Sequence, residues 1–127
     1  MTKLEEAYRQ IGGDWEGVTK RLMGESLVQR FVKKFIEEDK SFCQLKEALS
    51  VGDVKAAFMA AHTLKGVCQS LGFDGLFKPT NELTELLRAE SLEGSDVLFP
   101  QVEEQYNRIV ESLAPCLYTL KCLKTCQ

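Results

Sequence analysis

The residues of this chain best suited to chemistry surround its only histidine, His62. A neutral imidazole, the main form near pH 7, has a ring nitrogen that can act as a nucleophile, for example toward phosphorus. Lys65 follows one helical turn later, where its ammonium could neutralise phosphoryl oxygens. Gly66 comes next, although a glycine inside a helix costs about 1 kcal/mol relative to alanine. This cost suggests that another group must approach the backbone beside the imidazole.

The segment around His62 is predicted to form a helix that is capped by Asp53 and runs through about Leu71, just before Gly72. At about 100° per residue, the two faces of this helix differ in composition. The face predicted to enter a core carries Ala57, Ala60, Leu64, Val67, Cys68 and Leu71. His62 lies opposite these residues, and we therefore expect its side chain to point into solvent.

Five residues are expected to share the outward face with His62. They are Phe58, Met59, Lys65, Gly66 and Gln69. Large apolar residues such as Phe58 and Met59 on a wet face need a cover, which is either a docking partner or the short first helix. Lys65 and Gln69 would also be ordinary residues of a solvated surface. The face as a whole favours a docking surface around a reactive histidine.

The remaining chain reads as further helices separated by turn signals, without strand signals. A short helix from Asp14 to about residue 22 follows a lead-in segment, and a long helix is expected over about 26–49. The predicted buried stripe of the long helix consists of Leu27, Phe31, Phe35, Phe42, Leu45 and Leu49. Antiparallel helices with short connections predict an all-α fold, an up-and-down four-helix bundle with a short additional N-terminal helix.

Two prolines affect the last two predicted helices. A helix capped by Asp74 contains Pro79, which removes a backbone donor, so we expect a kink or a late start. A final helix over about 96–114 can accept Pro100 only in its first turn. Its expected core residues are Val102, Tyr106, Ile109 and Leu113.

Length and charge limit the classes of protein to which the chain can belong. We expect one domain over residues 1–127, with a core over about 14–114 and a C-terminal extension over 115–127, and we expect a monomer. A dimer contact through the extension is the alternative. The net charge of −3 argues against nucleic-acid binding. Without a signal-like or membrane-spanning apolar run, the expected location is the cytoplasm.

The cysteines are not predicted to hold a metal ion. They number five and lack C-x-x-C spacing, which fits reduced thiols better than a disulfide framework. Cys116, Cys122 and Cys126 are too few for a structural zinc site without a fourth ligand. We therefore expect neither a metal nor another cofactor.

The segment resembles the signature of histidine phosphotransfer (HPt) domains, in which His-x-x-Lys-Gly is followed by a Leu-Gly pair. These residues are His62-Thr63-Leu64-Lys65-Gly66 and Leu71-Gly72 here. The resemblance covers most of the chain except about the last dozen residues. It implies a four-helix bundle whose histidine is phosphorylated at Nε2, with a response-regulator receiver domain and a hybrid or sensor histidine kinase as partners. It also implies that the receiver supplies Mg²⁺ and that the bundle has little catalytic activity of its own.

One position departs from the family pattern. Family members commonly carry a Gln or Glu on the next helix, which accepts a hydrogen bond from the imidazole Nδ1, and here Thr84 occupies that position. Asn81 or Glu85 could replace it, since Pro79 makes the register of this helix ambiguous.

Two other functions compete with phosphoryl transfer. A helical adaptor could bind a receiver or kinase domain without accepting phosphate. An autonomous enzyme is disfavoured because no nucleophile motif and no Gly-rich ATP-binding loop are present. The phosphoryl group would therefore come from a partner.

Overall fold

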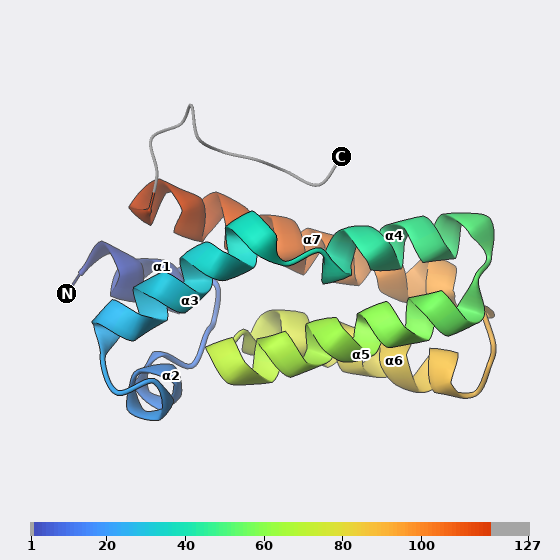
Figure 1. The fold of residues 1–127 in the computed structure, drawn as a ribbon, viewed down its shortest axis with the longest axis horizontal. Helices are drawn as coiled ribbons and strands as arrows, with labels where there is room; N and C mark the ends of the chain where they lie inside the picture. Colours follow the sequence, from blue (N-terminus) through green and yellow to red (C-terminus); the bar gives the residue numbers. More distant parts are fainter. Residues whose placement is uncertain (1, 118–127) are drawn as a thin grey trace.

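A computed structural model describes residues 2–117 as an all-α protein, in which seven α-helices and one short 3₁₀ helix form an elongated bundle (Figure 1). The helices are α1 (Lys3–Gln10), α2 (Trp15–Arg21), α3 (Glu25–Glu38), α4 (Ser41–Val51), α5 (Val54–Leu71), α6 (Asp74–Arg88), α7 (Ser95–Leu113) and η1 (Ala114–Cys116). In Figure 1, α3 and α4 lie end to end, and α4 and α5 run in front of α7 and α6. The predicted helical-bundle class is confirmed.

The helix that carries His62 begins and ends where the sequence predicts. The side chain of Asp53 accepts a hydrogen bond from the backbone N–H of Ala56, which caps the first turn of α5. Gly72 ends the helix with φ +71°, a left-handed conformation that glycine adopts without steric cost. Ala57, Ala60, Leu64, Cys68 and Leu71 are buried as predicted, whereas Val67 is only half-buried.

The single long helix predicted over 26–49 is wrong, because Asp39 and Lys40 divide it into α3 and α4. Asp39 leaves the helical conformation, with φ −72° and ψ 127°. Its carboxylate accepts hydrogen bonds from both the backbone N–H and the hydroxyl of Ser41, at the start of α4. Aspartate favours such a helix start because its side chain replaces the missing backbone acceptor.

The break also changes which face of α3 is buried. Val28, Val32 and Phe35 enter the core, whereas Leu27 and Phe31, predicted to be buried, are 36% and 43% exposed. In α4, Phe42 and Leu45 are buried as predicted and Leu49 is half-buried. The two halves of the expected stripe can rotate independently because no continuous helix couples them.

Both prolines lie inside helices, and neither the late start predicted for the helix with Pro79 nor the first-turn position predicted for Pro100 is found. The helix α6 begins at Asp74 without delay, Phe73 rather than Asp74 is its N-cap residue, and Pro79 is buried within it. Pro100 lies beyond the first turn of α7, which begins at Ser95. Each proline removes one backbone donor without ending its helix. The four predicted core residues of α7 are buried.

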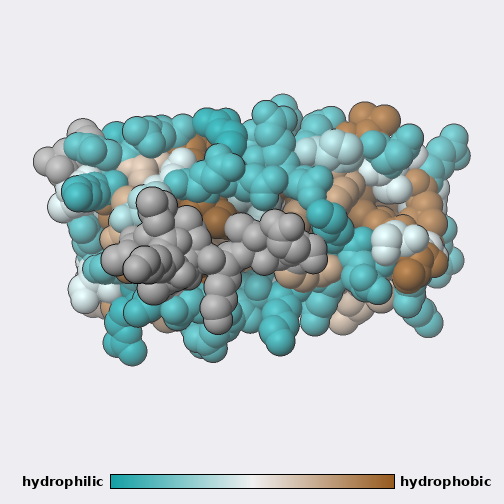
Figure 2. Space-filling model, turned by 90° about the horizontal axis from the view of Figure 1, so that it is seen from above, coloured by the Kyte–Doolittle hydropathy of each residue, from teal (hydrophilic) through white to brown (hydrophobic). Residues whose placement is uncertain are grey.

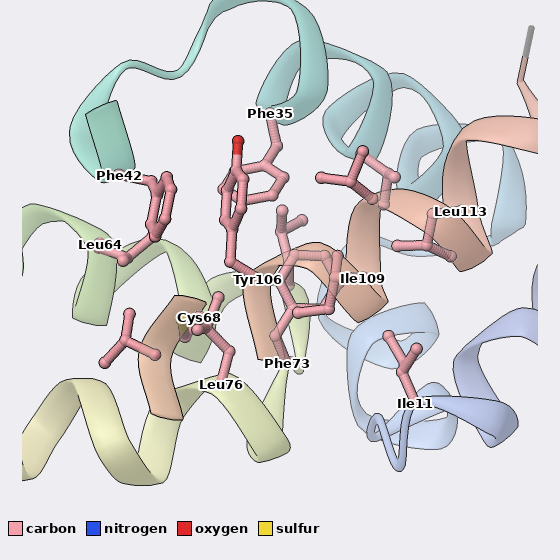
Figure 3. Packing of buried hydrophobic residues seen from close by; sticks show 14 of the residues in the cluster. Ile11, Phe35, Phe42, Leu64, Cys68, Phe73, Leu76, Tyr106, Ile109 and Leu113 are labelled. Carbon is pink, nitrogen blue, oxygen red and sulfur yellow. The ribbon is translucent and has the colours of Figure 1, made fainter. Parts of the chain in front are cut away.

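The core combines aliphatic residues of α5 and α6 with aromatic rings from α3, α4 and α7 (Figure 3). Phe42 and Tyr106 stack nearly parallel, with their ring centroids 4.0 Å apart. Tyr106 also packs edge-on against Phe35, at 5.9 Å. This aromatic cluster joins α3 and α4 to α7 across the break at Asp39.

The first two helices complete the C-terminal end of α5. Arg21 of α2 donates hydrogen bonds from Nη2 to the carbonyl oxygens of Gln69 and Ser70, at 3.0 and 3.3 Å. The backbone N–H of Asp14 donates to the carbonyl oxygen of Gly72. These donors satisfy carbonyl groups that the end of a helix leaves without partners. Leu4, Ala7, Tyr8 and Ile11 are part of the core, which thus begins before residue 14, where we expected it to begin.

Figure 2 shows the molecule from above, with hydrophilic residues over much of the described surface. Hydrophobic residues gather at the right-hand end, where Figure 1 places the α4–α5 and α6–α7 connections. Within residues 2–117, no helix combines the length and apolarity needed to cross a bilayer. The proposed dimer contact through the C-terminal extension falls largely on 118–127, outside the described residues.

The expectation of reduced cysteines is only partly right. Cys68 and Cys116 are free thiols, whereas Cys43 is disulfide-bonded.

Candidate functional site

His62 lies near the middle of α5 on its solvent-exposed side. The nearby residues Ala61 and Leu64 are buried and attach α5 to the core, while the imidazole remains outside it. Within residues 2–117, the imidazole contacts the Phe58 ring and forms no hydrogen bond. A ring nitrogen is therefore available to an incoming electrophile.

The Phe58 ring lies beside the imidazole, and a guanidinium from α6 lies over that ring. The centroids of the Phe58 and His62 rings are 5.8 Å apart, with the ring planes tilted by 44°. The Cζ atom of Arg88, in α6, lies 5.1 Å from the Phe58 centroid, within the range of a cation–π contact. Arg88 also pairs with Glu85, with 2.8 Å between Nε and Oε2. Phe58 is thus half-buried against α6, and the short α2 does not cover it.

Met59 is placed differently from Phe58. Its side chain is 64% exposed and borders a groove between α4 and α5, together with Thr63. The alternative that a short N-terminal helix covers this residue is wrong, since α2 contacts the opposite end of α5. Met59 is therefore an exposed apolar residue one helical turn before the histidine.

The residues that follow His62 leave its surroundings open. Apart from the adjoining residues and backbone of α5 itself, no heavy atom of residues 2–117 lies within 4 Å of the position that a Cβ atom of Gly66 would occupy. Lys65 is half-buried, and in the described part of the chain its ammonium has no ion-pair partner. The Gln69 side chain is exposed, and the backbone carbonyl oxygen of Gln69 accepts the hydrogen bond from Arg21. The predicted face around His62 is thus present, and two of its side chains, Phe58 and Lys65, are half-buried.

Thr84, which stands where the family commonly has a Gln or Glu, does not contact the imidazole. Its side chain is fully buried, and its hydroxyl donates to the Thr80 carbonyl oxygen at 2.7 Å. Glu85, one alternative, binds Arg88 instead. Asn81 is half-buried and forms no hydrogen bond with the imidazole. None of the three fixes the ring of His62 in this structure.

Arg88 is a candidate site residue that sequence reasoning missed. It lies 26 residues after His62, and its position over Phe58 depends on how α5 and α6 are aligned. The ambiguity that Pro79 introduces into α6 hides this alignment from the sequence. A pattern search could have noted only that an arginine occurs near the end of the following helix.

The described residues contain no cluster of three or more His, Cys, Asp or Glu side chains able to hold a metal ion. What the face itself presents is the exposed imidazole of His62, with Lys65 three residues further along α5. Such a group can accept and return an electrophile brought by another molecule.

Comparison with known proteins gives one match. A family model described as Hpt domain matches residues 30–112, which include α4, α5, α6 and most of α3 and α7. No curated protein and no solved structure matched the chain. The match covers more than half of the chain and contains every residue of the predicted site.

Proposed function

Because this chain belongs to the Hpt domain family, we propose that it carries a phosphoryl group on His62 and exchanges it with a receiver domain. Hpt domains mediate histidine phosphotransfer in two-component phosphorelays and interact there with receiver domains and histidine kinases. The observation that carries the proposal is the exposed imidazole of His62 in the middle of α5, without a hydrogen-bond partner among residues 2–117.

The proposed transfer is a single displacement at phosphorus. The lone pair of the His62 Nε2 forms the N–P bond while the P–O bond to the receiver's aspartyl carboxylate breaks. The carboxylate takes the electron pair of that bond, and the proton on Nδ1 stays on the ring. The reverse reaction returns the group to an aspartate.

The surroundings of His62 support this reaction in two ways. The ammonium of Lys65 lies three residues along the helix and has no ion-pair partner among residues 2–117, so it can reach phosphoryl oxygens and offset their charge. The open space beside Gly66 leaves room for the partner to approach the backbone. The exposed side chains of Met59 and Gln69 would contribute to the docking surface.

The partners that we propose are a response-regulator receiver domain and a hybrid or sensor histidine kinase. We propose that the chain meets these partners in the cytoplasm. No catalytic activity of its own and no cofactor are required for this role, because the incoming acyl phosphate already has a good leaving group.

Incubation of the chain with a ³²P-labelled receiver domain tests the proposal. Wild type should acquire an acid-labile, base-stable label, and His62→Gln should acquire none while keeping the same helical circular dichroism. Label on His62→Gln would contradict the assignment, since the chain has no other histidine. A receiver that binds wild type without transferring label would favour the adaptor function.

A further inference from the structure

We propose that Phe58 is a positioning residue for the His62 imidazole and that Arg88 holds Phe58 in place. The inference deepens the proposed phosphotransfer function and rests on it. It assigns to an aromatic contact the task that a polar side chain from the next helix would otherwise perform.

The imidazole needs such a restraint because no polar group among residues 2–117 forms a hydrogen bond with it. In an α-helix, a histidine side chain has two common χ1 orientations, and its χ2 angle is broad and roughly two-fold. An unrestrained ring would therefore spread over about four orientations, of which one presents the reacting nitrogen correctly. Thr84 cannot select this orientation, since its hydroxyl is buried and bound to the Thr80 carbonyl oxygen.

Phe58 is placed to provide the restraint. It precedes His62 by one helical turn, so the two side chains lie on adjacent positions of one face. The 5.8 Å between the ring centroids falls within the range of attractive aromatic pairs, and the ring planes are tilted by 44°. The imidazole that rests on this ring loses orientations in which it would leave the contact.

Phe58 can restrain His62 only if its own ring is fixed. One side of Phe58 packs against the hydrophobic core, which keeps the ring at the boundary between α5 and α6. The Arg88 guanidinium lies over the ring at 5.1 Å. The ion pair with Glu85, 2.8 Å long, in turn orients Arg88. A chain of contacts thus leads from Glu85 through Arg88 and Phe58 to the imidazole.

The variants that test this inference distinguish the effect of the Phe58 ring, the effect of the Arg88 cation and the effect of removing any positive charge from α6. Phe58→Leu keeps an apolar side chain but removes the ring, whereas Phe58→Tyr keeps the ring. Arg88→Gln removes the cation over the ring, and Arg88→Lys keeps a positive charge. Lys78→Gln is the matched control, since Lys78 is another exposed cation of α6 outside the site.

The first measurement is an NMR spectrum of the unphosphorylated protein. The imidazole protons of the single histidine give unambiguous signals, and the ring current of Phe58 should displace them from their solution positions. The displacement should vanish in Phe58→Leu, persist in Phe58→Tyr and Lys78→Gln, and shrink in Arg88→Gln. Unchanged imidazole signals in Phe58→Leu would overturn the inference.

The second measurement follows phosphorylation of His62 by two donors, a phosphorylated receiver and phosphoramidate. Because phosphoramidate is too small to depend on docking, it reports the imidazole alone. Phe58→Leu should slow both reactions by about three- to five-fold, as expected when about four orientations replace one. The receiver concentration for half-maximal rate should stay within about two-fold of wild type, Phe58→Tyr should react normally, and Arg88→Gln should be intermediate.

Four other results would contradict the inference, and one of them would also contradict the proposed function. If Phe58→Leu raises only the half-saturating receiver concentration, Phe58 is a docking residue and the positioning role is wrong. If Arg88→Gln slows transfer more than Phe58→Leu, Arg88 acts on the phosphoryl group directly and the inference is again wrong. If wild type accepts phosphate from neither donor, the proposed function fails and the inference fails with it, whereas an active wild type with a normal Phe58→Leu variant refutes the inference alone.

Discussion

The Tyr8 hydroxyl donates a hydrogen bond to the Leu71 carbonyl oxygen at 2.8 Å, which ties the first helix of the chain to the last residue of the helix that carries His62. Both groups are shielded from solvent, and Tyr8 lies outside the region matched by the Hpt family model. The N-terminal segment therefore stabilises the C-terminal end of α5, although it contributes no residue to the predicted site.

Tyr8→Phe should lower the free energy of unfolding by about 1–2 kcal/mol, because it leaves the Leu71 carbonyl buried without this donor. Urea denaturation followed by circular dichroism measures the change. Tyr106→Phe is a matched control, because the Tyr106 hydroxyl makes no hydrogen bond within residues 2–117, and it should change stability by less than about 0.5 kcal/mol. Equal losses in the two variants would show that the bond to Leu71 contributes little.

The stability of the protein should fall in alkaline solution. Burial raises the pKa of the Cys68 thiol and the pKa of the Tyr8 hydroxyl above their ordinary values. Above about pH 8.5 the unfolded chain loses the thiol proton, and above about pH 10 it loses the phenol proton, while the folded chain retains both. The unfolded state then binds fewer protons, so each group lowers stability by up to about 1.4 kcal/mol per pH unit.

Thermal unfolding from pH 7 to 10.5 measures this dependence. The variants Cys68→Ala and Tyr8→Phe start from lower stability, but their stability should decline less steeply above pH 8.5 and pH 10, respectively. Parallel curves for wild type and both variants would mean that other groups cause the alkaline loss.

Gly66→Ala should leave phosphotransfer nearly unchanged and raise stability by up to about 1 kcal/mol, because alanine is the better helix former and its Cβ would meet no other part of the described chain within 4 Å beyond the adjoining turn of α5. Gly66→Gln should slow transfer from a receiver, since its side chain would occupy the space beside the imidazole. Rates with labelled receiver check both variants. A normal rate in Gly66→Gln would show that the partner does not approach the backbone there.

Lys65→Ala should slow transfer or shorten the lifetime of the phosphohistidine by roughly 2–5-fold, the effect expected of one partly exposed charge pair. Its free energy of unfolding should change by no more than about 0.5 kcal/mol, because the ammonium has no ion-pair partner in the described part of the chain. Lys65→Arg should retain part of the effect, since a planar guanidinium supplies the charge from a different position.

The measurement for Lys65 is the transfer rate to one receiver over a range of salt concentrations. The difference between wild type and Lys65→Ala should be largest at low salt, where charges are least screened. Identical rates and lifetimes for all three proteins at low salt would make Lys65 an ordinary surface residue.

The sequence by itself determined the helix that carries His62 and the outward direction of the imidazole. Both follow from local rules, because Asp53 and Gly72 mark the ends of α5 and the apolar residues of this helix fall on a single face. The rotation between neighbouring residues of a helix is nearly constant, so the position of His62 relative to the buried face required no tertiary information.

Only the tertiary structure decided which face of α3 is buried and which residues of α5 and α6 are in contact. Leu27 and Phe31 are as apolar as Val28 and Val32, so both faces of α3 satisfy the pattern, and the break at Asp39 allows the valine face to enter the core. The register between α5 and α6 likewise places Arg88 over Phe58 and turns Thr84 into the core. Such contacts join residues distant in sequence, and their geometry depends on how whole helices pack, which local periodicity does not contain.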